Sequence, residues 1–317
     1  MLIDLTAEFF AAAAAVDPLE AYRRYYQTHK PILSAYWHNY ILDPDSQQAE
    51  EIMLRTVTAS RRDLHQLLDQ VDVATLAAET YERCAQTYGI ERPTDICLMV
   101  GVGGANAGEL VVGGRGIAFI CLEHFTGKPN AETYGLGLSP DLLPIWVAHG
   151  LAHTVRYTSR LSRSAISRIV FEAGGNYNCW DVASSAALRE LMINEGLSVA
   201  ASRIIAPGFD SHEYYGYGSQ QYRRMRQLEA FLKRAVAPEL SQTGIGYRLR
   251  YLTGGVPQSS RVVGGRVLPE RSGYYLGHRM VEDHVVEFGL QTALVMEAEA
   301  FATTTTTGAA DIEAQPA

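Results

Sequence analysis

The sequence lacks any apolar run long enough to span a lipid bilayer, which excludes a helical membrane-spanning protein. It also lacks an excess of positive charge. The formal net charge of -8 argues against nucleic acid or an anionic membrane as the main partner. The apolar stretch near the N-terminus follows Asp4 and Glu8 rather than basic residues. We therefore expect an amphipathic helix there and not a signal peptide.

Cysteine is scarce, and its spacing excludes a disulfide framework or a zinc site of the cysteine type. The residues are Cys84, Cys97, Cys121 and Cys179, with no paired spacing among them. We expect free thiols in a reducing compartment, and hence a cytoplasmic protein. Hydrophobic residues make up 47% of the chain and charged residues 20%, which is ordinary for a protein that buries a sizeable core.

The patterns along the chain predict an α+β fold. Residues 1–92 read as a helical N-terminal region, in which residues 47–88 form one long helical pattern. Beyond residue 92, three β-rich segments predict strands at residues 96–102, 109–114 and 116–125, packed on helices. We expect this second domain to span residues 93–302. Residues 303–317 are of low complexity and predict a disordered tail.

A glycine-rich stretch at residues 101–108 resembles a dinucleotide-binding loop, but its context does not fit one. That motif requires a helix that begins at the glycines and an acidic residue placed to bind a ribose. Here the chain continues into another strand-like segment. We interpret the stretch as a turn between two strands.

The most informative segment is WVAHGLAHTVRY, which places His149 and His153 four residues apart in a predicted helix. This spacing puts both imidazoles on one face of the helix, one turn apart. Two imidazoles so placed can share one tetrahedral metal ion, usually zinc. The related motif His-Glu-x-x-His carries a glutamate that acts as general base, and here that position is Gly150. Three further histidines, His29, His38 and His65, have no partner at ligand spacing.

A third metal ligand is expected on a later helix. In ALRELMINEGLSVA, Glu195 shares a face with Leu191 and Met192, which should point to the core. An ionised carboxylate there is costly unless it is paired or binds a metal. A buried glutamate satisfied by an arginine or a histidine is the alternative. Glu190 is the weaker candidate, because its neighbours suggest a more polar face.

In these segments the sequence resembles the gluzincin-type zinc metallopeptidases, and more closely the family of predicted zinc-dependent proteases labelled DUF2268 (YjaZ-like). The residues that carry the resemblance are VGVGGANAG, GIAFICLEHF, VAHGLAHTVRY, INEGLSVA and GYYLGHRMVED, which together span roughly residues 93–290. The resemblance implies a zincin-like domain, a small sheet packed on active-site helices, with Zn²⁺ as cofactor.

By position, the resemblance makes His149, His153 and Glu195 the zinc ligands. It makes residues 116–125 the edge strand that pairs with an extended peptide or protein substrate. It also implies that a late helix brings a group that polarises the scissile carbonyl, for which Tyr274, Tyr275 and His278 are the candidates. Aromatic core packing explains these last three residues equally well.

The departure from the family pattern is Gly150, because glycine cannot take a proton from zinc-bound water. Three explanations are open: a natural pseudopeptidase, an inactivated variant of an enzyme, or another carboxylate that substitutes, with Glu123 the nearest guess. The sequence therefore predicts a zinc metallopeptidase impaired in turnover. The alternative is a non-catalytic zinc-binding protein that holds a peptide or protein partner in its cleft.

Overall fold

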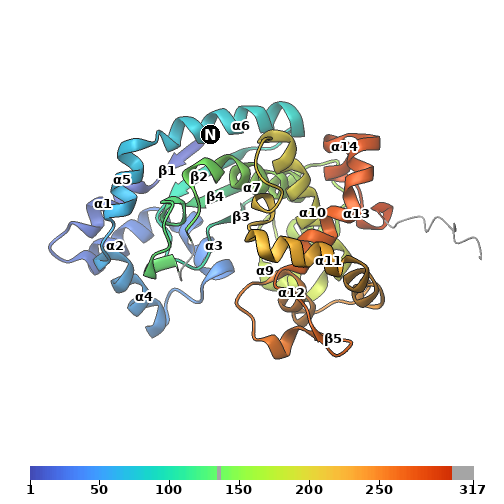
Figure 1. Ribbon diagram of the computed structural model, residues 1–317. Helices are drawn as coiled ribbons and strands as arrows, with labels where there is room; N and C mark the ends of the chain where they lie inside the picture. Colours follow the sequence, from blue (N-terminus) through green and yellow to red (C-terminus); the bar gives the residue numbers. More distant parts are fainter. Residues whose placement is uncertain (134–136, 302–317) are drawn as a thin grey trace, which may run out of the picture.

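The structure is a computed structural model that describes residues 1–133 and 137–301. It has a mixed α+β architecture in which helices predominate around a small sheet (Figure 1). The sheet contains β1 (Leu2–Asp4), β2 (Thr94–Met99), β3 (Ala107–Val112) and β4 (Arg115–Cys121), in the order β1-β2-β4-β3. The first three strands in this order run parallel, and β3 is antiparallel to β4. The predicted α+β class is confirmed.

The predicted edge strand at residues 116–125 is wrong. Strand β4 lies between β2 and β3, so both of its edges are already paired, and Leu122–Phe125 continues as a 3₁₀ helix. The edge of the sheet on this side is β3 instead. Sequence pattern indicates which segments are strands, but the order of strands depends on contacts between distant segments.

The N-terminal region is not helical throughout, because β1 pairs with β2 and so belongs to the same sheet. The long pattern at residues 47–88 is three helices rather than one, and the side chain of Asp72 caps the third of them. The helices of this region are α1 (Thr6–Ala13), α2 (Pro18–Thr28), α3 (Lys30–Tyr40), α4 (Gln47–Thr58), α5 (Arg62–Gln70) and α6 (Val73–Tyr88). Their buried side chains join one continuous core with the rest of the protein.

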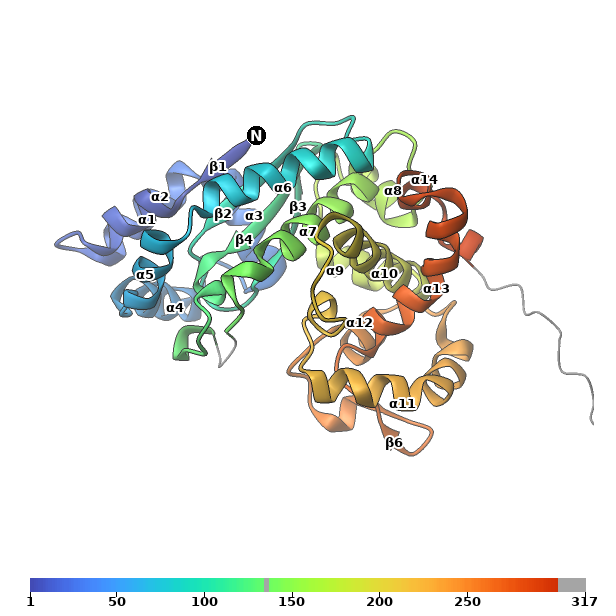
Figure 2. The same ribbon diagram turned by 45° about the horizontal axis from the view of Figure 1, so that its top comes forward.

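Helix α7 (Leu143–Thr158) is central, and both views place it between the strands and α10 (Leu188–Ile205) (Figures 1 and 2). It is buried along its whole length up to Tyr157, as expected of a helix covered on every side. Small residues let it approach the sheet closely. A side chain added at Gly116 would meet Thr154, and one added at Gly150 would meet Ala118 at 3.0 Å.

The opposite face of β4 carries Phe119, whose ring packs edge-on against Tyr36 and Tyr40 of α3 at centroid distances of 5.2 and 4.8 Å. Alternate residues of one strand therefore face α7 and α3, as the two-residue period of a strand requires. The sheet is covered on both faces. The glycine-rich stretch connects β2 to β3 without opening a helix, which agrees with its interpretation as a turn.

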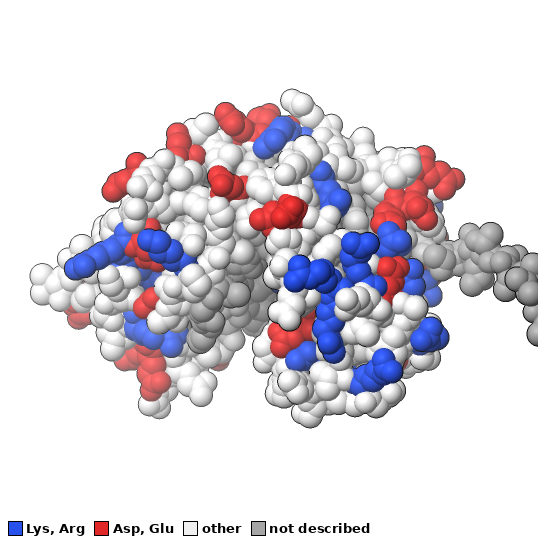
Figure 3. Space-filling model, in the orientation of Figure 1, with Lys and Arg blue, Asp and Glu red and all other residues white. Residues whose placement is uncertain are grey.

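The remaining helices build the second half of the molecule. They are α8 (Ala165–Glu172), α9 (Cys179–Ser185), α10, α11 (Ser219–Val236), α12 (Ile245–Leu252), α13 (Ser272–Phe288) and α14 (Leu290–Val295), with a small hairpin of β5 (Val262–Val263) and β6 (Arg266–Val267). Figure 3 shows the surface hollowed between this half and the N-terminal helices. Lys and Arg gather over α11, where Arg223, Arg224 and Arg226 are exposed.

Helices α10 and α13 meet backbone to backbone. A methyl group added at Gly196 would lie 2.1 Å from the carbonyl carbon of Gly277, and one added at Gly277 would lie 1.9 Å from the carbonyl oxygen of Met192. Both distances are far below van der Waals contact, so only glycine fits at this crossing. The residues beside the two glycines are thereby brought together across the helix pair.

Two other expectations concern the whole chain. The four cysteines are free, as predicted, and all four are buried. Within residues 1–133 and 137–301, no helix has the length and apolar character needed to cross a membrane. The predicted disordered tail at residues 303–317 lies outside the described residues.

We predict that Gly277→Ala destabilises the protein by about 1–3 kcal/mol, because the added methyl group forces two helix backbones apart. Gly246→Ala is the matched control. Gly246 lies in α12 with open space around it, so alanine should stabilise the helix by up to about 1 kcal/mol. Chemical denaturation measures both free energies of unfolding. A Gly277→Ala variant as stable as the parent protein would contradict the close crossing.

Candidate metal centre

The three predicted ligands converge. His149 and His153 project from α7, and Glu195 projects from α10 toward them. The Nε2 atoms of the two histidines lie 3.1 Å apart. Oε2 of Glu195 lies 3.3 Å from Nε2 of His149 and 3.5 Å from Nε2 of His153. These residues form a group that could hold a metal ion.

The separations can be compared with those that a tetrahedral ion imposes. Nitrogen and oxygen donors bind zinc at about 2.0–2.1 Å, so two donors on a tetrahedral ion lie about 3.3 Å apart. The observed separations of 3.1, 3.3 and 3.5 Å bracket that value. Two imidazoles and one carboxylate, with a fourth position left open, are also the donor set of a catalytic zinc site. The residues present therefore fit a tetrahedral ion.

A second layer of contacts orients His153. Its Nδ1 lies 3.1 Å from Oγ of Ser198, and that hydroxyl donates to the carbonyl oxygen of Asn194. Because the single hydroxyl proton is used in this way, Ser198 accepts a hydrogen bond from Nδ1–H of His153. This arrangement directs Nε2 of His153 toward the other two donors, as metal-binding histidines require.

Burial and charge set the protonation of the metal-free group. Burial lowers the pKa of His149 in spite of the neighbouring Glu195. For His153 burial acts in the same direction, but the carboxylates of Glu109 and Glu195 outweigh it and raise the pKa to about 9. The two imidazoles hold the pKa of the Glu195 carboxyl below its usual range even though it is buried. Near pH 7 the proton therefore resides on His153, paired with the Glu195 carboxylate.

A small cavity of about 90 Å³ adjoins these donors. The residues that line it are Tyr40, Asn106, Ala107, Gly108, Glu109, Trp146, His149, Gly150, His153, Glu195, Arg248, Arg271 and Tyr274. They come from both halves of the chain, so the N-terminal α3 is part of the site. Gly150 lines this cavity without a functional group, and a β-carbon added to it would lie 3.0 Å from Ala118 of β4 and 3.2 Å from the carbonyl oxygen of Gly108 of β3.

Of the three residues predicted on the late helix, only Tyr274 lies at the site. Its ring stacks on His149 with centroids 6.1 Å apart and an interplanar angle of 17°. Tyr275 instead donates to the carboxylate of Glu229 at 2.5 Å, and Nδ1 of His278 lies 2.8 Å from the hydroxyl of Tyr215. Neither Tyr275 nor His278 lines the cavity, because successive positions on α13 face different neighbours.

Two other glutamates considered from the sequence are used elsewhere. Glu190 forms a buried ion pair with Arg156 at 2.8 Å. Glu123 accepts hydrogen bonds from the backbone N–H groups of Gly101 and Gly103, and it does not line the cavity. Glu123 therefore anchors the glycine-rich turn and is not placed to replace a base at position 150.

Glu109 is the site carboxylate that sequence reasoning missed. It lies on the edge strand β3, is 8% exposed, lines the cavity, and accepts a hydrogen bond from the hydroxyl of Tyr157 at 3.2 Å. A charged residue within an apolar strand after the glycine turn was the available signal. Arg248 and Arg271 also line the cavity, and no spacing pattern marked them.

Comparison with protein-family models, with curated proteins and with solved structures gave no match. The resemblance to zinc-dependent proteases therefore rests on the quoted sequence segments, and the site rests on its own geometry.

We predict that binding of a divalent cation near pH 7 releases about one proton, because His153, with a pKa of about 9, must lose its proton to become a ligand. The number released should fall toward zero as the pH rises above about 9, where His153 is already neutral. Calorimetry in two buffers with different ionisation enthalpies measures it. Stoichiometric binding without proton release near pH 7 would contradict this assignment.

Proposed function

We propose that this protein has a zincin-like fold and binds Zn²⁺ through His149, His153 and Glu195 in a metallopeptidase site of impaired turnover. The observation that carries the proposal is the convergence of two imidazoles and one carboxylate at separations of 3.1–3.5 Å, beside a cavity. Zinc is favoured over other common ions by this mixture of nitrogen and oxygen donors in tetrahedral geometry.

A zinc ion bound there would polarise a carbonyl group and lower the pKa of a bound water molecule. Tyr274 would assist, because its phenol, whose pKa is raised by burial, is protonated near pH 7. A protonated phenol can donate a hydrogen bond to a developing oxyanion. Its ring is held by stacking on His149 and by the Arg271 guanidinium 4.2 Å from its centroid.

Proton transfer is where the site is deficient. Glycine at position 150 offers no base, and Glu109 is the one carboxylate of the described cavity lining besides the proposed ligand Glu195. Glu109 already accepts a hydrogen bond from Tyr157 and neighbours His153, whose pKa it raises. General base catalysis contributes about 10²–10⁴-fold, so a poorly placed base leaves weak activity at most.

Peptide binding is proposed beside β3, the edge strand next to the cavity. However, the hydroxyl of Tyr40 occupies the outward backbone groups of Glu109: it accepts from the N–H at 3.0 Å and donates to the carbonyl at 2.9 Å. The backbone N–H of Tyr177 donates to the carbonyl of Val111 at 2.9 Å. An extended substrate could therefore pair with only a short part of this strand.

These covered edge groups, together with Gly150, support a second candidate function. The protein is then a non-catalytic zinc-binding pseudopeptidase that holds a peptide or protein partner in the cleft. The two candidates share the metal site and differ in turnover.

Metal analysis of the purified protein is the first test. We expect about one zinc per chain, and a loss of at least about 10-fold in zinc affinity for Glu195→Ala, because one of three ligands is removed. His149→Ala should behave in the same way. His38→Ala, at an exposed histidine far along the chain from the ligands, is the control and should retain zinc. Metal-free preparations that do not take up zinc would refute the site.

Restoring a carboxylate at position 150 separates the two functions. We expect Gly150→Glu to raise peptide-bond hydrolysis by about 10²–10⁴-fold over Gly150→Gln, which adds the same bulk without the base. Both variants require β4 to move by a few tenths of an ångström, because the new β-carbon lies 3.0 Å from Ala118. The measurement is cleavage of an unfolded protein at equal zinc content. If Gly150→Glu binds zinc and cleaves no better than Gly150→Gln, the pseudopeptidase function is favoured.

A further inference from the structure

We propose that Arg271 binds a substrate carboxylate in the metal cavity, and that the preferred group is the free C-terminal carboxylate of a peptide. The inference deepens the proposed function, on which it rests for the peptide nature of the ligand. Arg271 immediately precedes α13 and lines the cavity together with His149, Glu195 and Tyr274.

The backbone of Arg271 adopts a left-handed conformation, with φ 55° and ψ 26°. Within the described part of the chain it is the only residue other than glycine with positive φ. Such a conformation costs of order 1–3 kcal/mol and persists where surrounding contacts enforce it, commonly at ligand sites. A strained arginine that lines the candidate metal cavity is therefore a candidate ligand-binding residue.

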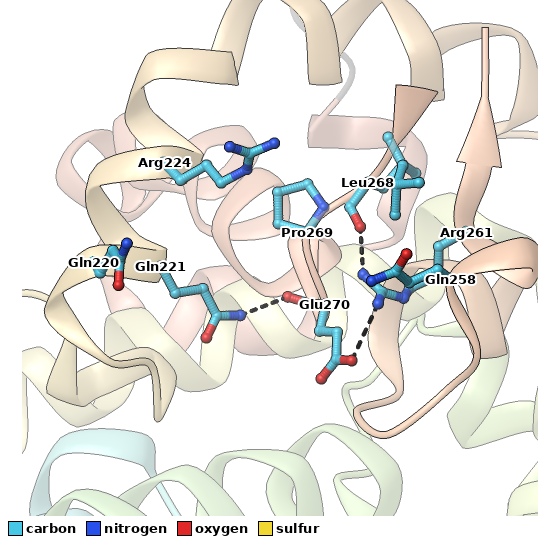
Figure 4. A pocket seen from close by; sticks show the side chains of 9 residues that line it. Gln220, Gln221, Arg224, Gln258, Arg261, Leu268, Pro269 and Glu270 are labelled. Carbon is cyan, nitrogen blue, oxygen red and sulfur yellow. Dashed lines mark hydrogen bonds and ion pairs between the residues drawn. The ribbon is translucent and has the colours of Figure 1, made fainter. Parts of the chain in front are cut away.

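The contacts that enforce this conformation surround the segment that leads to it (Figure 4). Arg261 donates to the carbonyl oxygen of Leu268 at 2.5 Å and to the carboxylate of Glu270 at 3.2 Å. Gln221 donates to the carbonyl oxygen of Glu270 at 2.9 Å. These residues line a separate, polar pocket of about 460 Å³, which serves here as the support of the segment.

The hydroxyl of Tyr217 completes this support by donating to the carbonyl oxygen of Arg271 itself at 2.5 Å. Each backbone carbonyl named, at Leu268, Glu270 and Arg271, thus has a side-chain donor. The segment is therefore held from Leu268 up to the strained residue itself.

The guanidinium of Arg271 is attracted by the Glu195 carboxylate but forms no ion pair with it. In the residues that the structure describes, no carboxylate lies within 4.0 Å of it, and the adjacent Glu270 pairs with Arg261. Cζ of the guanidinium lies 4.2 Å from the centroid of the Tyr274 ring. A guanidinium carries five N–H donors in a planar fork, so the side-chain hydrogen bond that Arg271 shares with Tyr274 leaves donors for a bidentate contact with a carboxylate.

The charge of the cavity also favours an anion. With both histidines neutral, as ligands of a metal ion must be, the charged lining residues among those described are Glu109, Glu195, Arg248 and Arg271, whose formal charges cancel. Both carboxylates already have partners, because Glu195 contacts the two histidines and Glu109 accepts from Tyr157. A divalent cation at the three donors would leave the cavity positive, and an anionic ligand would restore the balance.

Because the edge of β3 is partly covered, the cavity favours binding of the end of a peptide over binding of an internal segment. Tyr40 and Tyr177 occupy outward backbone groups at Glu109 and Val111, so a peptide cannot extend along the strand past these residues. The cavity itself is small, at about 90 Å³. A peptide whose C-terminal carboxylate contacts Arg271 satisfies both constraints. A peptide that contacts Arg271 through an internal acidic side chain would have to continue beyond the cavity.

The test compares three ligands by calorimetry: N-acetyl-trialanine, its C-terminal amide, and an N-acetylated amide with glutamate in the middle position. A charge-assisted bidentate contact predicts that the free acid binds about 10- to 100-fold more tightly than its amide. In Arg271→Asn this ratio should fall to about 1, because asparagine tolerates positive φ but carries no charge. Arg266→Asn, at an exposed arginine outside the cavity, should keep the ratio.

Equal binding of acid and amide, absence of binding by all three ligands, or a ratio unchanged in Arg271→Asn would overturn the proposal. Tight binding of the glutamate amide would overturn the preference for a chain end. Arg271→Lys keeps the positive charge but lacks the planar guanidinium, so it should show an intermediate ratio of acid to amide affinity. It also guards against a folding defect in the asparagine variant.

Repeating the titrations on metal-free and zinc-loaded protein tests the zinc site and the role of Arg271 separately. If the protein prefers the free acid over its amide but takes up no zinc, only the zinc site is refuted. If it takes up zinc but binds the acid and the amide equally, only the role of Arg271 is refuted.

Discussion

The close crossing of α10 and α13 at Gly196 and Gly277 is the contact on which the candidate site depends. It places Glu195, next to Gly196, and Tyr274, one turn before Gly277, on the side where both reach His149. A side chain at either glycine would force the helices apart and separate the carboxylate from the imidazoles. The same logic applies on the other side of α7, where glycine and alanine in β4 let the helix lie close to the sheet.

Two imidazoles and a carboxylate enclosed in a buried part of the protein are costly unless something compensates their desolvation. In the metal-free protein the compensation is a shared proton, which lies on His153 and pairs with Glu195. A divalent cation would replace that proton, and the separations of the donors already suit it. Gly150 does not disturb this balance, because it lines the cavity without a charge or a donor atom of its own side chain.

The N-terminal helices contribute to the site rather than only supporting it. Tyr40 of α3 lines the cavity and covers the backbone of Glu109 on the edge strand. From the opposite half, Arg271 enters in a conformation that its neighbours enforce. Tyr40 thus covers part of the edge strand, and Arg271 contributes a positive charge to the cavity lining. These two features underlie our proposal that the cavity receives the end of a peptide.

The sequence alone determined what depends on local spacing. Two histidines four apart lie on one face of a helix whatever surrounds it, Glu195 shares a face with core residues, and Gly150 cannot act as a base. Only the tertiary structure decided which strand is the edge, that Tyr274 and not Tyr275 or His278 reaches the site, and that Glu109, Tyr40 and Arg271 belong to it. These depend on strand order, on which face of a helix meets a given neighbour, and on contacts between residues far apart in the chain. No local periodicity encodes them, because each is settled by packing between elements.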